Sequence, residues 1–470
     1  MNIKNKTIRV KLVGDGTKTG PLTMLNFGFT LPDQGLISKT AAGNFQLGCF
    51  EIEKENYETL KSCLAEMAKN LSNFCQTTNN QIQIGDTVYT IKFLLGGDMK
   101  FLHTMMGLNA CNSNHACLWC KLHKKSFAKL SKDALPEIED LKRTIEEQAT
   151  NLNGQEVFLE DPKSYLGYSN LRIFDFITFD DCVFDTLHML LRIVEKLMKL
   201  FLTELESLDE SKSTNIRDLP YQQRFFESLR KIGVQNPIYY DNDIFKMKSF
   251  TGEDCLNILE KLHFEQFFSN EFYPKFVKKD TFNSLLRGFN EIFLNVKNNS
   301  YAENKDLLQI KTDEWLSLFT STFNKKHVTS YIHVFCHHLC MFIEEHGDVD
   351  IYNCQGIEKR NHFLTREYFG TNRNYNQKNY QYQMMAYRNR IESYKRVVPK
   401  INRKKMSLKL NLIRSTINMN ESKRNWVEYI IGEHKINCNE TVTTFSTKVN
   451  LVLFLELHVS SQGKYCDLVP

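Results

Sequence analysis

Residues 93–121 constrain the fold of this chain more than any other segment. They begin within an apolar run, residues 91–95, which is typical of a buried β-strand. Gly96-Gly97 interrupts the run, so the strand is expected to end there, with Asp98 just after its C-terminal end. Apolar residues at helical spacing follow, and then the pair Cys117-x2-Cys120. The segment therefore predicts a strand, an acidic residue, a short helix and two candidate metal ligands.

The flanking sequence predicts a mixed sheet with helices. Residues 7–15 alternate apolar side chains, expected inward, with Arg9 and Lys11, expected outward, and Gly14-Asp15-Gly16 is expected to end this strand before a turn. Further strands are predicted at residues 22–31, 45–52 and within 81–95, and an amphipathic helix at 53–75. This order indicates an α/β fold with a mixed sheet. Residues from about 130 to 328 are mostly helical in pattern and are expected to form one large insertion.

Composition restricts the class of protein. The chain is 42% apolar and 24% charged, which is ordinary for a globular protein. Thirteen cysteines in 470 residues are too dilute for a disulfide scaffold. No secretory signal and no membrane span are expected, because no segment has the required apolar length. We therefore expect a reducing intracellular setting, in which paired Cys and His residues favour zinc over disulfides.

Basic residues are concentrated in residues 359–424. This region holds 17 Lys and Arg residues and three acids, although the net charge of the whole chain is only +5. Tyr and Phe residues are interleaved with the basic ones, a mixture that suits phosphate contacts and base stacking. A solvated basic helix with its aromatic residues in a core is the plainer alternative. The candidate DNA contacts are Lys359, Arg360, Arg388, Arg390, Lys395 and Arg396.

Four residues are candidate zinc ligands. Cys117 and Cys120 would supply two, although two buried structural cysteines would explain the pair equally well. His333-x4-His338 lies in a predicted helix at residues 328–346, and the two histidines are expected to share one face and reach a single ion. His337 is expected to point about 100° away from His338. Four protein ligands close a tetrahedral site, so this zinc would be structural.

Three carboxylates are candidate ligands for catalytic metals. Asp15 and Asp98 each follow a predicted strand and a glycine, and Glu358 stands at the start of a predicted helix. Three carboxylates around one site can hold two Mg²⁺ ions, which is the arrangement that phosphodiester chemistry requires. Taken one at a time, an Asp beside Gly is more often an ordinary turn residue. Asp185-x2-His188, in the predicted insertion, is expected to be a core pair or to approach the carboxylates.

Taken in order, these motifs resemble the catalytic core shared by the V(D)J recombinase catalytic subunit (the recombination-activating protein) and Transib transposases. The similarity extends from about Ile8 to Lys395. Gly14-Asp15-Gly16 and the segment around Asp98 resemble those with the family's first two catalytic acids. The segment from Gln355 to Asn361 resembles the one with its catalytic Glu, and the Cys and His pairs stand where the family binds zinc.

The resemblance implies an RNase H-like mixed sheet interrupted by a zinc-bearing helical insertion. The catalytic core would comprise residues 1–125 and 346–400, with the insertion at 126–345 and a tail of unassigned role at 401–470. It implies Mg²⁺- or Mn²⁺-dependent nicking of DNA by Asp15, Asp98 and Glu358, followed by strand transfer. Nuclear location, DNA as partner and a homodimer are the corresponding expectations. The family's N-terminal zinc, dimerisation and end-recognition parts have no expected counterpart here.

Two other functions fit the same sequence. The first is a zinc-stabilised DNA-binding derivative of a transposase that no longer cuts DNA. The second is a helical interaction protein in which all three acids are turn residues. Convergence of the three carboxylates separates the last hypothesis from the others, and a nicking assay separates the first two.

Overall fold

A computed structural model of the chain describes residues 6–19, 22–153, 166–209, 213, 215–242, 244–263 and 278–371. Described residues up to 362 belong to one compact unit, and described residues 363–371 belong to a second. Almost all described residues belong to the first unit. Residues 372–400 of the predicted catalytic core and the tail at 401–470 lie outside the described residues.

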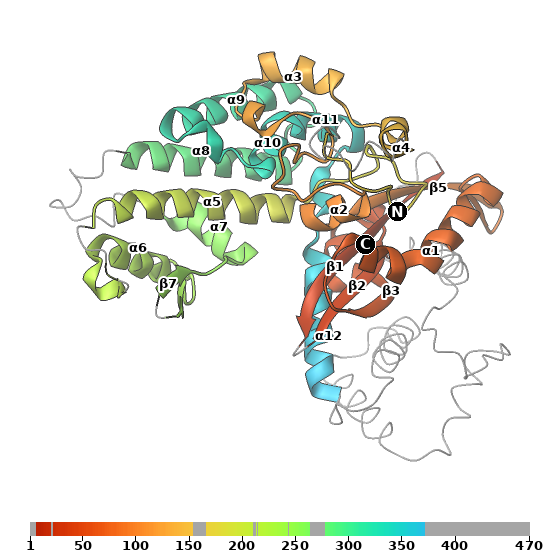
Figure 1. Ribbon diagram of the computed structural model, residues 1–470, viewed down its shortest axis with the longest axis horizontal. Coiled ribbons are helices and arrows are strands. Elements are labelled where there is room, and N and C mark those ends of the chain that lie inside the picture. The colour runs from red at the N-terminus through yellow and green to blue at the C-terminus, as the bar shows by residue number, and fades with distance from the viewer. Residues whose placement is uncertain are drawn as a thin grey trace, which may run out of the picture. The chain divides into compact units, whose positions relative to one another are not determined.

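A five-stranded sheet carries the first acidic residue. Its strands have the spatial order β3-β2-β1-β5-β4, and only the β1–β5 pair is parallel (Figure 1). The predicted mixed sheet is thereby confirmed. The strands are β1 (Thr7–Thr19), β2 (Leu22–Thr30), β3 (Asn44–Ile52), β4 (Gln81–Ile84) and β5 (Thr87–Gly96).

The first strand is longer than predicted. β1 continues through Gly14-Asp15-Gly16 to Thr19, because its antiparallel ladder with β2 extends that far. Gly14 therefore does not serve a turn. A Cβ atom at Gly14 would lie 2.5 Å from the ring of Phe101, so the missing side chain lets the helix after β5 pack closely on β1.

The two faces of the sheet are both covered. Ile8, Val10 and Leu12 are fully buried and belong to the main hydrophobic cluster, to which the helix α1 (Tyr57–Thr78) contributes its apolar stripe. On the other face, Val13 packs with Cys354 and Ile357. Lys11 on that face is only 1% exposed, so the prediction that it points outward to solvent is wrong. The reason is that residues 349–362 cover the face that an isolated hairpin would expose.

Helices make up most of the remaining described chain. The predicted helix at 328–346 is divided into two. A small hairpin, β6 (Ile238–Asp241) with β7 (Ile244–Met247), was not predicted. The helices are α2 (Met99–Met105), α3 (Ser131–Asp140), α4 (Ile145–Asn153), α5 (Thr186–Glu206), α6 (Pro220–Lys231), α7 (Gly252–Lys261), α8 (Lys279–Lys297), α9 (Lys305–Thr322), α10 (Ser330–His337), α11 (Leu339–His346) and α12 (Gln355–Thr371), with 3-10 turns that include η1 (Pro32–Lys39) and η8 (Val349–Tyr352).

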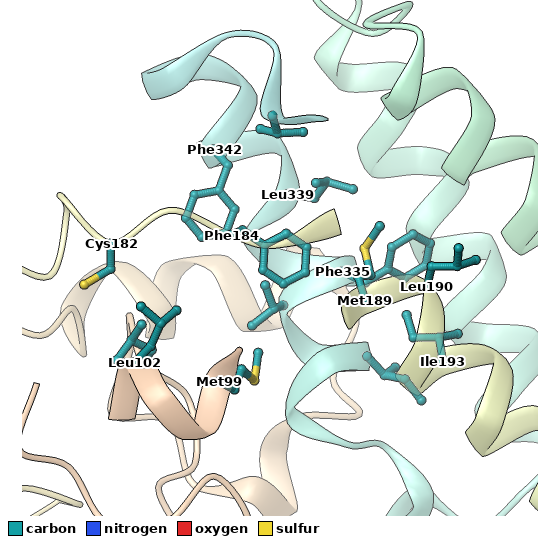
Figure 2. Close-up of a cluster of buried hydrophobic side chains, with 14 of the residues drawn as sticks. Met99, Leu102, Cys182, Phe184, Met189, Leu190, Ile193, Phe335, Leu339 and Phe342 are labelled. Carbon is teal, nitrogen blue, oxygen red and sulfur yellow. The ribbon is translucent and has the colours of Figure 1, made fainter. Parts of the chain in front are cut away.

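The helical segment shares its core with the sheet. Figure 2 shows side chains of α2, α5, α10 and α11 meeting in one buried cluster, where Met99 and Leu102 lie near Phe184 and Phe342. The same hydrophobic cluster continues to Ile8 of β1. Within the described ranges, no helix combines the length and apolarity that crossing a membrane requires.

Candidate zinc centre and carboxylate site

Cys117, Cys120, His333 and His338 form a buried cluster. Each offers one ligand atom, and these four atoms all lie within 4.8 Å of one another. All four side chains are at most 1% exposed. Among the residues that the structure describes, this is the one group of three or more His, Cys, Asp and Glu residues that meets this criterion. The predicted ligands are therefore brought together from segments more than 200 residues apart.

The spacing of the ligand atoms fits a tetrahedral zinc ion. Cys117 Sγ lies 3.4 Å from His338 Nε2, and Cys120 Sγ lies 3.4 Å from His333 Nε2. The two Nε2 atoms are 3.2 Å apart. Zinc–sulfur bonds of ~2.3 Å and zinc–nitrogen bonds of ~2.0–2.1 Å at tetrahedral angles imply edges of about 3.6 Å and 3.3 Å. The cluster could therefore hold zinc with small adjustments of the side chains.

A break in the helix explains how both histidines reach one point. His333 and His338 are five residues apart, which on a regular helix places them about 140° from each other and not on one face as predicted. The chain instead ends α10 at His337 and starts α11 at Leu339, with His338 between them at φ −111° and ψ −14°. This break turns His338 toward His333. His337 is outside the cluster, as predicted, and its Nε2 lies 3.4 Å from the carbonyl oxygen of Phe127.

The cysteine pair is supported by residues 141–143. Lys121 N donates to Leu141 O at 2.8 Å, and Arg143 N donates to Trp119 O at 3.0 Å. The buried Arg143 side chain donates from Nε to Cys117 O at 3.0 Å and from Nη2 to His115 O at 3.1 Å. Burial raises the pKa of the Cys117 thiol, but its interactions with Cys120, His338 and His333 outweigh burial and hold this pKa well below the usual value. The pair is thus rigid, and Cys117 is predisposed to the thiolate form that binds zinc.

Asp15 and Asp98 lie just beyond the same end of the parallel β1–β5 ladder. In the parallel ladder of β1 and β5, Val13 pairs with Gly96. Asp15 stands two residues after Val13, and Asp98 stands two residues after Gly96. Asp98 Oδ1 accepts a hydrogen bond from Phe101 N at 2.7 Å and so caps the N-terminus of α2. The carboxylate of Asp98 therefore has a structural role in addition to any chemical one.

Glu358 reaches this end of the ladder from α12, which runs beside the sheet (Figure 1). One turn along α12, Asn361 donates from Nδ2 to Asp15 Oδ2. Asn26, the neighbour of Asp15 across the β1–β2 ladder, donates to Asn361 Oδ1 at 2.9 Å. These bonds fix the face of α12 that carries Glu358 against the strand that carries Asp15.

His188 connects α5 to Glu358. Its Nε2 lies 3.4 Å from Glu358 Oε1, while its Nδ1 is paired with Asp185 Oδ2. Although burial lowers the pKa of His188, Asp185 and Glu358 raise it to about 9, so the ring is protonated at neutral pH. Of the two sequence hypotheses for this histidine, the geometry supports the approach to the carboxylates.

Burial and neighbouring negative charges raise the pKa values of both Asp15 and Glu358. Burial, followed by the negative charges of Asp98 and Glu358, raises the pKa of Asp15 to about 7. Burial and the charges of Asp185 and Asp98 also raise the pKa of Glu358, against the opposing effects of His188 and Arg192. The carboxylate oxygens of Asp15, Asp98 and Glu358 do not all approach within 4.8 Å of one another. Mutual repulsion of this kind is what a shared cation relieves.

The predicted DNA contacts are only partly described. Lys359 is exposed, whereas Arg360 is 6% exposed and donates from Nη1 to Ala41 O at 3.2 Å. Arg360 thus packs α12 against the turn before β3 and does not face solvent as a DNA contact requires. Arg388, Arg390, Lys395 and Arg396 lie outside the described residues.

Sequence reasoning missed several residues around the carboxylates. Lys100 pairs with Glu55, whose charge also contributes to the raised pKa of Asp15. Tyr331 of α10 accepts a hydrogen bond from Met99 N at 3.3 Å, which connects the helix that carries His333 to the start of α2. No local sequence pattern signals these contacts, because each joins segments that are distant in the chain.

Comparison with known proteins does not assign a family: no protein-family model matches the chain, and a search of curated proteins finds no match.

Proposed function

We propose that this chain is the catalytic core of a divalent-metal-dependent DNA recombinase or transposase, built on an RNase H-like sheet. The observation that carries the proposal is the placement of Asp15, Asp98 and Glu358 around the C-terminal end of the parallel β1–β5 ladder. They come from β1, from the end of the adjacent parallel strand β5 and from a helix packed on β1. After burial, the charges of Asp98 and Glu358 contribute to the raised pKa of Asp15, which supports a common site.

The donor set fits Mg²⁺ or Mn²⁺. Carboxylate oxygens are the ligands that these cations prefer. The raised pKa of Asp15 reflects burial first and then the negative charges of Asp98 and Glu358, which a bound cation would balance. Divalent ions held there supply activation of the attacking oxygen and neutralisation of the charge that develops on the phosphate. By contrast, the Cys2His2 cluster is closed by four protein ligands and would be structural.

The residues of this chain would divide the remaining work. Asp15, Asp98 and Glu358 bind the cations. Asn361 orients Asp15 by donating to its Oδ2, and protonated His188 holds one oxygen of Glu358. In the first step water attacks a phosphodiester, and the bond to the 3′ oxygen breaks to leave a nick with a free 3′ hydroxyl. In the second step this hydroxyl attacks a phosphodiester of another strand, forming one P–O bond as another breaks.

A nicking assay tests the proposal. Supercoiled plasmid incubated with the protein and Mg²⁺ or Mn²⁺ should become nicked, and Asp98→Asn and Glu358→Gln should abolish nicking. Asp86→Asn, the same chemical change at an exposed turn between β4 and β5, should leave nicking at the wild-type level. Nicking that survives in Asp98→Asn would contradict the proposal. Folded wild-type protein that binds DNA but never nicks it would favour the inactive DNA-binding alternative.

A further inference from the structure

Lys11 is a buried cation that none of the roles above explains. It belongs to β1, four residues before Asp15, and only 1% of its surface is exposed. Burial of a lysine is unfavourable unless its ammonium group finds polar partners. Apolar side chains surround this part of the sheet face: Val13 packs with Cys354 and Ile357, and Leu94 packs with Val183 and Tyr352. An apolar residue would therefore be the ordinary choice at this position.

The ammonium group of Lys11 holds the segment that leads into α12. Its Nζ donates to Tyr352 O at 2.7 Å and to Asn353 O at 3.2 Å. These carbonyls belong to the last turn of η8 and to the residue after it, directly before the helix that carries Glu358. The lysine thus fixes the carbonyl groups of two residues that precede Glu358 by six and five positions.

Asp185 holds the same segment from the opposite side. Its Oδ1 accepts from Cys354 N at 2.8 Å, and the same carboxylate caps the start of α5. Asp185 is buried, and burial raises its pKa, but His188, the bond from Cys354 and the charge of Lys11 lower it below the usual value. Residues 352–354 are therefore held by a cation on their carbonyl oxygens and by an anion on an N–H group.

The stem of Lys11 also crosses the strand that leads to Asp98. A Cβ atom at Gly96 would lie 2.7 Å from Lys11 Cδ and 3.2 Å from Cγ, so the methylene groups pass directly over this glycine. Gly96 is the last residue of β5 and stands two residues before Asp98. One side chain consequently contacts the three segments that carry the three carboxylates.

We propose that Lys11 is a positioning residue that sets the place of Glu358 relative to Asp15 and Asp98. The proposal rests on the proposed function of these carboxylates as a metal site. Lys11 touches no substrate or metal. It acts by fixing the start of α12 against β1 and the end of β5, so that the position of Glu358 relative to Asp15 and Asp98 is already restricted when cations bind. Such outer residues typically change metal affinity by about 10- to 100-fold.

The test compares Lys11→Met with Lys39→Met. Methionine keeps the apolar stem of Lys11 but has no donor for the two carbonyl groups. Lys39 is a suitable control because its ammonium group pairs with the side chain of Asp350, on the same stretch of chain, whereas that of Lys11 bonds the carbonyl groups of Tyr352 and Asn353. Mn²⁺ binding is measured by calorimetry on zinc-loaded protein, together with the Mn²⁺ concentration for half-maximal nicking and the melting temperature.

We expect Lys11→Met to weaken Mn²⁺ binding by about tenfold or more, with nicking restored at high Mn²⁺. Lys39→Met should lower the melting temperature without changing the Mn²⁺ dependence. If Lys11→Met melts earlier but binds Mn²⁺ as wild type does, the lysine is only structural and the proposal is wrong. If Lys11→Met does not fold, Gly96→Ala provides the second test, because its Cβ displaces the lysine stem without removing the charge.

Failure of the proposed function gives a different result. In that case the wild-type protein does not nick DNA, and any Mn²⁺ binding that it shows is unchanged in Asp98→Asn. A wild type that binds Mn²⁺ through Asp98, together with a Lys11→Met variant of unchanged affinity, would overturn only the role of Lys11.

Discussion

At the scale of single residues, Asp15 combines burial with two neighbouring negative charges. Its pKa is about 7 in the folded chain, compared with an ordinary value of 3.8. Between these two pH values the folded chain holds a proton that the unfolded chain has released. The contribution of Asp15 to stability therefore falls as pH rises through this window. Above it, the half-buried carboxylate is charged beside the negative charges of Asp98 and Glu358.

This reasoning predicts the behaviour of Asp15→Asn. With zinc bound and no other divalent ion present, the melting temperature of the wild type should fall relative to the variant between pH 5 and pH 8. Addition of Mg²⁺ at pH 8 should stabilise the wild type and leave the variant unchanged, because the ion replaces the lost proton. Parallel melting curves for the two proteins across this pH range, with or without Mg²⁺, would show that Asp15 is not under electrostatic strain.

Arg143 is the residue that most directly supports the zinc ligands. Its guanidinium donates to the carbonyl groups of Cys117 and His115 and lies over the ring of Tyr168, 4.9 Å from the ring centre. We predict that Arg143→Met releases zinc to a chromophoric chelator about 10- to 100-fold more readily than the wild type. Arg172 is the matched control, since it also donates two hydrogen bonds to a backbone carbonyl, that of Asp175, outside the zinc cluster. Identical zinc release by Arg143→Met and Arg172→Met would refute the role.

At the scale of secondary-structure elements, the type of an element was often predictable from sequence, but its first and last residues were not. The apolar stripe of α1 and the capping box that begins α7, where Thr251 and Asp254 exchange hydrogen bonds, follow from local sequence. The break at His338 does not, because residues 328–346 have an uninterrupted helical pattern. The break is stabilised by distant contacts, such as the approach of His338 to Cys117, 221 residues away. The extension of β1 to Thr19 likewise depends on its partner β2.

The close packing of α12 against the turn before β3 depends on Gly356. A Cβ atom there would lie 1.9 Å from Asn44 Nδ2 and 2.8 Å from Thr40 O, so this helix approaches the turn before β3 as closely as a glycine permits. Gly356→Ala should push α12 outward, destabilise the fold by about 1–3 kcal/mol and reduce nicking by moving Glu358. Denaturant unfolding and the plasmid assay measure the two effects.

Gly288→Ala in α8 is the control for this substitution. There the nearest atom to an added Cβ is Trp315 Cδ1 at 3.2 Å, and α8 carries none of the carboxylates. This variant should be less destabilised and should nick DNA normally. Wild-type nicking by Gly356→Ala would show that α12 tolerates displacement and that its close packing does not control Glu358.

At the scale of the whole chain, the four candidate zinc ligands join the two ends of the helical segment. Cys120 and His333 are 213 residues apart, and the chain between them includes α3 to α9. The cysteines follow α2, which Asp98 caps, and the histidines precede the segment that carries Glu358. A single ion would therefore hold the second and third carboxylates in register without touching either.

Removal of zinc should consequently affect folding and activity together. A zinc-selective chelator, with Mg²⁺ kept in excess, is expected to increase hydrogen exchange in α5, α10 and α11 and to abolish nicking, because metal-binding free energy at such a site is folding free energy. Restoring zinc should reverse both changes. Purified, folded protein that contains no zinc, or full nicking after chelation, would contradict this prediction.

Sequence alone predicted the mixed sheet, the mostly helical pattern after it and the candidate ligands, but not how the ligands are held. Asp15, Asp98, Glu358 and the four zinc ligands stand out because their residue types and local spacings are chemically specific. Lys11 and Arg143 do not stand out, since a lysine in a strand or an arginine in a loop usually faces solvent. Their roles arise only when the sheet face and the cysteine pair are covered by segments distant in the chain.

Anomalous diffraction from crystals grown with Mn²⁺ tests the central claim most directly. The account predicts a zinc signal surrounded by Cys117, Cys120, His333 and His338, and manganese signals between Asp15, Asp98 and Glu358, with oxygen ligands at ~2.0–2.3 Å. Crystals of Asp98→Asn should keep the zinc signal and lose manganese. Manganese absent from the three carboxylates of the wild type at saturating concentration, with zinc in place, would contradict the claim that this chain builds a catalytic metal site.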